Sequence, residues 1–171
     1  SWTATAFPCQ IYALGGVGTG IPIRVTITSF GPLLLSRVLD LNETQESSLQ
    51  LVFHYADQQG LPLLDLKDLR SVIQHLVSDG GKAVLQNLGG LSRQTAGVIL
   101  RELIAFEAQG ADQFFGEPEL ATSELLQLAP DGRGMVSILE LPMLQDRPAL
   151  FSTFLMWLLA DLFEELPEVG D

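Results

Sequence analysis

The stretch from residue 135 to residue 165 places the strongest limit on what this chain can fold into. Residues 135–139 (MVSIL) show little polar alternation, which predicts a strand buried on both faces. Residues 148–165 then carry apolar side chains around nearly the whole circumference of a helix, and such a helix needs packing partners on several sides. A strand followed by a helix is half of a β-α-β unit, and the chain ends where the next parallel strand is expected.

The first thirty residues are predicted to form a β-hairpin. The segments FPCQIYAL (7–14) and PIRVTITS (22–29) are rich in apolar and β-branched residues, and the second alternates like a strand with one wet face. Cys9 is the single cysteine and cannot form an internal disulfide, which fits a cytoplasmic protein. We expect Cys9 to be a small buried hydrophobic side chain rather than a reactive thiol.

Four glycines crowd the connection between these strands, LGGVGTGIPI, and raise the question whether the loop Gly15–Gly20 holds a phosphate. A phosphate-binding loop opens a helix, and a P-loop ends in Gly-Lys-Ser/Thr. Here Pro22 and a strand follow, and no lysine lies nearby. The pair Gly81-Lys82 fails as well, because Ala83 stands where serine or threonine is needed. We interpret the loop as a turn in which glycine supplies positive φ, with nucleotide binding as the alternative.

The middle of the chain carries the signals of capped helices. A short apolar helix follows Pro32, and three longer amphipathic helices come after it. The expected N-caps are Asn42, Asp65 and Ser92, and the expected stops are Gly60, Gly80 and Gly110. Short links between these helices predict a bundle-like unit.

The adjacent aromatic residues Phe114 and Phe115 are expected in the core rather than on a base-stacking surface, because nearby acidic residues would repel phosphate. Together the patterns predict a mainly α (α+β) fold. We expect a β-hairpin over residues 1–30, a helical insertion over 31–130 and a strand–helix piece over 131–171.

The charge balance argues against nucleic-acid binding by this segment alone, with a local basic patch as the alternative. The formal net charge is −12, from 21 acidic against 9 basic residues, and the arginines are scattered. The run between Arg147 and Asp161 is shorter than the ~20 residues that cross a bilayer, so we expect no membrane partner. With hydrophobic residues at 47% of the chain, a folded cytoplasmic globule is expected.

The remaining titratable residues do not suggest a metal site or a catalytic acid–base pair. His54 and His75 have no partner at metal-ligand spacing. Asp65 and Asp68 are explained by the start of a helix, where negative charge is favourable. We therefore predict no catalytic residue, no cofactor-binding residue and no metal ligand.

Several stretches together resemble the HerA-like P-loop ATPases, in the bacterial subgroup often called YjgR-like. They are SFGPLLLSRVLDLNETQESSLQLVFHYADQQGLPLLDLKDLRSVIQH, GADQFFGEPEL, GRGMVSILEL and LFSTFLMWLLADLFEELPEVGD, within residues 7–171. The resemblance implies a RecA-like ATPase core, a likeness to hexameric DNA-translocating motors of the HerA and FtsK type, and ATP and Mg as cofactors of the full-length protein. The implied partners are the remainder of the ATPase core, further copies in a hexamer, and DNA for the full-length protein.

The resemblance also implies what this segment lacks. In the family a Gly-Lys-Thr loop (Walker A) precedes the matched region and a strand with the acidic Walker B pair follows it, so no ATP-site residue carries over to a position here. The loop Gly15–Gly20 departs from the family's FGEQGHP-like turn. The expected function is a non-catalytic segment of an ATPase; an autonomous helical interaction or oligomerisation module is the alternative.

An uncovered sheet edge and apolar patch would favour the ATPase segment over the autonomous module. Arginine can reach the phosphate of a neighbouring subunit, so Arg93, Arg101 and Arg133 are candidates for such a trans-acting role. Pairing with local acidic residues is the simpler interpretation and the one we favour.

Overall fold

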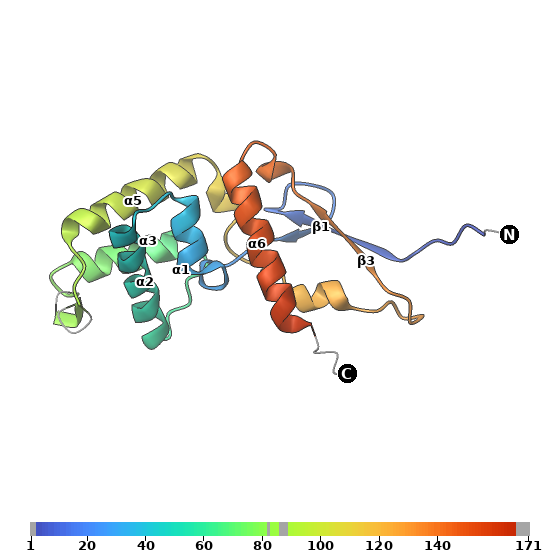
Figure 1. The fold of residues 1–171 in the computed structure, drawn as a ribbon, viewed down its shortest axis with the longest axis horizontal. Coiled ribbons are helices and arrows are strands. Elements are labelled where there is room, and N and C mark those ends of the chain that lie inside the picture. The colour runs from blue at the N-terminus through green and yellow to red at the C-terminus, as the bar shows by residue number, and fades with distance from the viewer. Residues whose placement is uncertain (1–2, 82, 86–88, 167–171) are drawn as a thin grey trace. The chain divides into compact units, whose positions relative to one another are not determined.

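A computed structural model describes residues 3–81, 83–85 and 89–166 (Figure 1). The chain forms two compact units: Ser1–Arg24 with Pro118–Asp171, here the sheet unit, and Val25–Glu117, here the helical unit. These boundaries differ from those of the predicted segments 1–30, 31–130 and 131–171. The chain leaves the sheet unit after Arg24 and returns to it at Pro118, and these two residues lie side by side. There the Arg24 N–H donates to the Pro118 carbonyl (2.7 Å), and the Leu120 N–H donates to the Arg24 carbonyl (2.9 Å).

The sheet unit contains three parallel strands in the order β2-β1-β3. They are β1 (Cys9–Leu14), β2 (Ile21–Ile23) and β3 (Val136–Glu140). In register, Tyr12 lies beside Ile21 on one side, and Ile11 lies beside Ile138 on the other. The parallel pairing of β3 agrees with the strand–helix unit predicted from residues 135–165.

The predicted hairpin is wrong, because β1 and β2 run parallel. Period-two alternation identifies a strand but does not give the direction of its neighbour. The predicted strand 22–29 also ends early, at Ile23. The hydroxyl of Thr26 accepts the Ser29 N–H and caps helix α1 (Ile27–Val38), so the alternating residues after Ile23 lead into a helix. Helix α1 is kinked at Gly31, just before Pro32.

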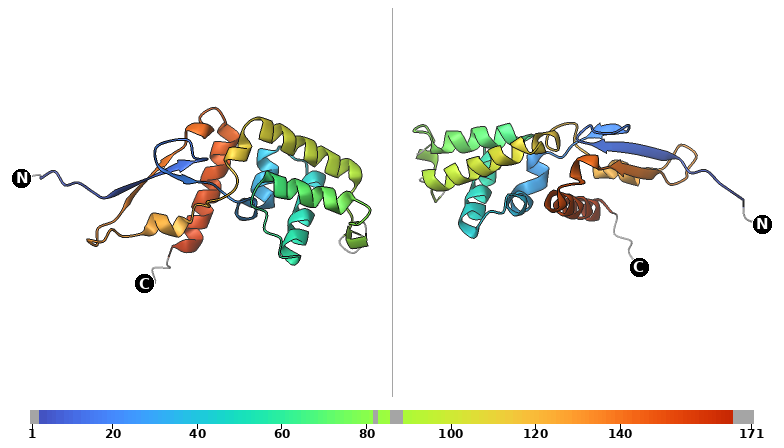
Figure 2. Two further views of the ribbon diagram at one scale, coloured as in Figure 1. Left: turned by 180° about the vertical axis from the view of Figure 1, so that it is seen from behind. Right: turned by 90° about the horizontal axis from the view of Figure 1, so that it is seen from above.

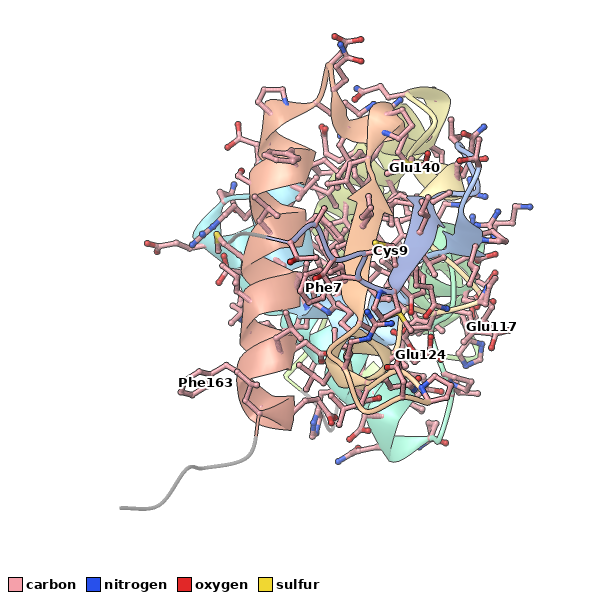
Figure 3. All side chains as sticks on the ribbon, turned by 90° about the vertical axis from the view of Figure 1, so that its right-hand side faces the viewer. Phe7, Cys9, Glu117, Glu124, Glu140 and Phe163 are labelled. Atoms are coloured by element: carbon pink, nitrogen blue, oxygen red, sulfur yellow. The ribbon has the colours of Figure 1, made fainter. Side chains whose placement is uncertain are left out.

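Helix α6 (Pro148–Glu165) completes the sheet unit and lies beside β3 (Figure 3). Its buried residues include Phe154 and Trp157, whose rings stack with centroids 5.8 Å apart. The hydroxyl of Thr122, in the 3-10 helix η2 (Thr122–Leu126), hydrogen-bonds the Asp161 carboxylate of α6. The long apolar helix predicted from the sequence is confirmed.

One side of β1 and β3 remains uncovered. Ile11, Val136 and Ile138 are 39–44% exposed, and Cys9 is exposed beside its register neighbour Val136. Two predictions are therefore wrong: the strand near 135–139 is not buried on both faces, and Cys9 is not a buried side chain. The physical reason is that no described segment packs over this side of the sheet.

In its described part, the helical unit contains α1 and three further α-helices of 12 to 16 residues (Figure 2). They are α2 (Glu43–Gln58), α3 (Leu66–Val77) and α5 (Arg93–Ala108). The predicted N-caps are confirmed: Asn42 and Asp65 form capping boxes with the residues three positions on, and the Ser92 hydroxyl accepts the Thr95 N–H (3.0 Å).

The aromatic core of the helical unit confirms the prediction for Phe114 and Phe115. Both are buried, and with Phe30 they form edge-to-face pairs with centroids 4.7–5.9 Å apart. Edge-to-face geometry is favourable because the positive ring edge meets the negative ring face. None of the helices in the described part of the chain combines the length and apolar character needed to cross a membrane.

Candidate functional site

The glycine-rich loop Gly15–Gly20 lies at the carboxyl end of β1, the edge at which parallel α/β sheets commonly bind ligands. Gly15, Gly16 and Gly18 adopt φ values of 69°, 71° and 147°, which other residues adopt only with strain. The Gly15 N–H donates to the Ile23 carbonyl (2.8 Å). The interpretation of the glycines as turn residues is confirmed, although the turn joins parallel strands.

This loop binds an anion that the chain itself supplies. Glu140 is the last residue of β3 and lies beside Ala13 in the sheet register. One oxygen of its carboxylate accepts the N–H groups of Thr19 (2.7 Å) and Gly20 (2.9 Å), and the other accepts the Thr19 hydroxyl (3.1 Å). We call this set of Thr19, Gly20 and Glu140 the clasp; Figure 3 labels Glu140 at the end of β3.

Close contacts explain why Gly18 and Gly20 are glycines. A Cβ atom on Gly18 would lie 2.2 Å from the Glu140 carboxylate, and one on Gly20 would lie 2.6 Å from the backbone of Ile11. Both distances are too short for real atoms, so the loop needs glycine for space as well as for positive φ. The glycines thus serve the shape of the turn, and the anion that the turn binds is a carboxylate of the same chain.

The hydrogen bonds from the backbone N–H groups of Gly20 and Thr19 lower the pKa of the Glu140 carboxyl below its ordinary value. The side chain is therefore ionised at neutral pH and neutralises the partial positive charge of the two amides. Arg24 lies next to the loop, with a guanidinium nitrogen 3.8 Å from the position of a Cβ on Gly16. While Glu140 is engaged, the loop offers neither of these N–H groups to a phosphate.

Sequence reasoning missed Glu140, because 121 residues separate it from Thr19. The available signal was its place directly after a predicted parallel strand, since the carboxyl ends of such strands meet at one edge. We conclude that the clasp is an anion-binding and positioning element, in which Glu140 holds the loop.

The structure does not gather the arginine candidates into one site. Arg133, in the sheet unit, pairs with Asp131 (2.6 Å), and Arg93 on α5 pairs with Asp79 (3.3 Å). Arg101 is exposed on α5, with its guanidinium near Gly97. Local pairing of Arg93 and Arg133 is thus observed, while a trans-acting role for any of the three stays a prediction.

The two histidines lie apart from any metal-ligand cluster. His75 stacks on Tyr55 with ring centroids 6.4 Å apart, and His54 is exposed on α2. Among residues 3–81, 83–85 and 89–166, no group of three or more histidine, cysteine, aspartate or glutamate side chains is placed to hold a metal ion.

Comparison with known protein families gives a match over the whole sequence. Residues 1–171 match the family model described as "Helicase HerA-like C-terminal". Neither a curated protein nor a solved structure matches the chain significantly. The match covers both the sheet unit and the helical unit, in agreement with the resemblance drawn from the sequence.

Proposed function

The chain belongs to the helicase HerA-like C-terminal family, and from this premise we propose that it is a segment of a HerA-like, FtsK-type DNA-linked ATPase. We assign it to the YjgR-like subgroup, between the phosphate loop and the Walker B strand of a RecA-like core. In this proposal the segment is not catalytic by itself. The sheet unit is a piece of the core, and the helical unit is an insertion within it.

The topology of the sheet unit supports this proposal. All three strands are parallel, and parallel sheets are normally covered by helices on both faces because their crossover connections carry helices. The crossover from β2 to β3 contains the whole helical unit, Val25–Glu117. A large insertion in a crossover leaves the sheet itself intact, as expected for a shared core with a specialised addition.

The observation that carries the proposal is the uncovered apolar side of the sheet. Ile11, Val136 and Ile138 are exposed there, and in the described chain β3 pairs with a neighbour on one side only. Helix α6 also exposes Leu159 (66%) and Phe163 (80%). An unpaired strand edge beside exposed apolar side chains marks a surface that a larger assembly buries. We infer that a further strand and helices of the ATPase core cover it.

We propose that this segment holds no ATP site of its own. The converging N–H groups of Thr19 and Gly20 are engaged by Glu140, and no described lysine stands beside this loop. We therefore place ATP and Mg²⁺ on other parts of the core. In the assembled protein we propose a homo-oligomer, a hexamer by family resemblance, that contacts DNA through surfaces other than this acidic segment.

An autonomous helical interaction or oligomerisation module is the second candidate function. The exposed apolar residues of α6, Phe163 above all, favour it because they could bind a partner helix directly. The two candidates differ in whether the exposed side of β1 and β3 has a role. Only the ATPase segment requires that surface to be covered by further core elements.

The test compares ATP binding and hydrolysis by the 171-residue chain and by a longer HerA-like chain in which these residues are embedded. We expect turnover only in the longer chain, and loss of turnover when Ile138→Lys places a charge on the exposed side of the sheet. Leu33→Lys on α1 is the matched control, since Leu33 is also exposed and apolar. Hydrolysis by the short chain, or equal turnover of the Ile138 and Leu33 variants, would contradict the proposal.

A further inference from the structure

The helical unit contains a groove that the proposed function does not use. It lies between α1, α2 and the segment 60–63, has a volume of about 710 Å³ and is open to solvent. The ribbon around it is visible in Figure 1, where α1 and α2 are labelled. The lining is mainly apolar and comes from Pro32, Phe53, Ala56, Leu61, Pro62 and Leu63. Leu61 is 44% exposed, so it offers an apolar contact to an incoming side chain.

Hydrogen bonds fix the wall of this groove in place. The Leu61 N–H donates to the Ala56 carbonyl (2.8 Å) at the end of α2, and Gly60 takes a positive φ of 63° in the turn between them. The Leu63 N–H donates to the Thr28 hydroxyl (2.9 Å), which in turn donates to the Leu63 carbonyl (3.2 Å). A wall tied to both α1 and α2 is formed before any ligand arrives, which reduces the entropy lost on binding.

Asp57 is the acidic side chain among the residues that line the groove, and Glu46 lies one turn before the lining residue Gln50 on α2. Gln50, His54 and Asp57 line the groove from one face of α2, and the amide of Gln50 donates to the Glu46 carboxylate (3.4 Å). Among the residues that the structure describes, no lysine or arginine lines the groove, and α2 contains neither. The carboxyl end of α2 adds partial negative charge beside Asp57 through the helix dipole. The groove thus favours a basic ligand.

We propose that this groove binds a basic and apolar peptide segment of a partner protein. A bulky apolar side chain of the segment packs between Phe53 and Leu61. Lysine or arginine side chains on either side of it pair with Glu46 and Asp57. Glu46 and Asp57 are eleven residues apart on α2, which is about 16 Å at the rise of an α-helix. An extended peptide covers this distance in five residues, so lysines at both ends of a hexapeptide can reach both carboxylates. The proposal does not depend on the proposed ATPase function.

The probe is a hexapeptide with a lysine at each end and tryptophan-leucine at its centre, titrated into the 171-residue chain by calorimetry. The matched probe replaces both lysines by glutamates. We expect the lysine peptide to bind roughly tenfold more tightly than the glutamate peptide, because its lysines complement the carboxylates of Glu46 and Asp57.

Three variants locate the binding. Asp57→Lys and Glu46→Lys each weaken the lysine peptide about fivefold, and Leu61→Ser weakens both peptides about tenfold. Glu102→Lys on α5 is the control: it makes the same charge change at an exposed residue outside the groove lining and shifts the affinity less than twofold. Circular dichroism confirms that each variant is folded.

Several outcomes would overturn the proposal. One is no binding of the lysine peptide at about 1 mM, which corresponds to the weak end of specific affinity. Another is equal binding of the two peptides, or equal effects of Asp57→Lys and Glu102→Lys. A concentration-dependent dimer of the chain that dissociates on Leu61→Ser would show that a second copy occupies the groove instead.

Discussion

The carboxylate of Glu140 accepts the backbone N–H of Thr19 at 2.7 Å, and this contact ties the end of β3 to a loop that lies 121 residues earlier in the chain. The same oxygen accepts the Gly20 N–H, so one side chain satisfies two neighbouring amides. Loops of this kind at the carboxyl edge of a parallel sheet usually hold a ligand anion. Here the internal carboxylate holds the loop in shape.

The first prediction concerns pH. Because the clasp lowers the pKa of Glu140, its ionised form stabilises the folded chain above the ordinary value of 4.5, and this stability is lost as the pH falls through the lowered pKa. Glu140→Gln removes the charge but keeps the size of the side chain. We expect the variant to melt below the wild type at pH 7 and the two melting temperatures to converge toward pH 3. If the difference between the two melting temperatures were the same at pH 7 and pH 3, the ionised Glu140 carboxylate would not be the source of the stability.

The second prediction concerns the loop glycines. Gly18→Ala and Gly20→Ala should each destabilise the chain by about 2 kcal/mol, because the added Cβ meets Glu140 or the backbone of Ile11. Gly97→Ala inside α5 is the control, since its Cβ meets only the flexible end of Arg101 at 3.7 Å. It should be neutral or stabilising by about 1 kcal/mol. Urea unfolding measures the free energy of unfolding of the three variants. An equal loss of stability in all three would contradict the close contacts of Gly18 and Gly20.

The third prediction concerns the ion pair between Arg70 on α3 and Glu107 on α5 (3.0 Å), whose side chains are only 27% and 18% exposed. Glu107→Ala leaves the half-buried guanidinium without this partner and should cost about 1–3 kcal/mol. Asp79→Ala breaks the exposed pair with Arg93 and should change stability by less than about 0.5 kcal/mol. Chemical denaturation measures the free energy of unfolding of both variants. Similar small losses in the two would show that the pair between Arg70 and Glu107 adds little stability.

The fourth prediction concerns the arginine candidates in a longer, ATP-hydrolysing chain. Arg93 and Arg133 each pair with an aspartate of their own unit, so we expect Arg93→Ala and Arg133→Ala to change kcat less than twofold. A trans-acting arginine typically contributes about 10³-fold or more. A loss of that size in mixed oligomers of wild-type and variant subunits would identify either residue as trans-acting and contradict local pairing as its main role.

Local sequence signals determined much of the helical structure of both units. Asn42, Asp65 and Ser92 cap their helices as predicted, and the long apolar helix appears as α6. These features depend on side chains within about four residues of one another, so hydrogen bonding and helical period are readable from the chain alone. The burial of Phe114 and Phe115 followed from the same local reasoning.

Only the tertiary structure decided the direction of β2, the exposure of Cys9 and the occupant of the glycine loop. The alternation of polar and apolar residues shows which side chains of a strand face the core, but it does not show the direction of the neighbouring strand. The parallel pair β1 and β2 was therefore predicted as a hairpin. Glu140 reaches Thr19 because the sheet register places β3 beside β1. The sequence by itself determined where the capped helices and the long apolar helix lie and that the loop needs glycine. Strand pairing over more than a hundred residues decided what the loop binds, because non-local contacts depend on how whole elements pack.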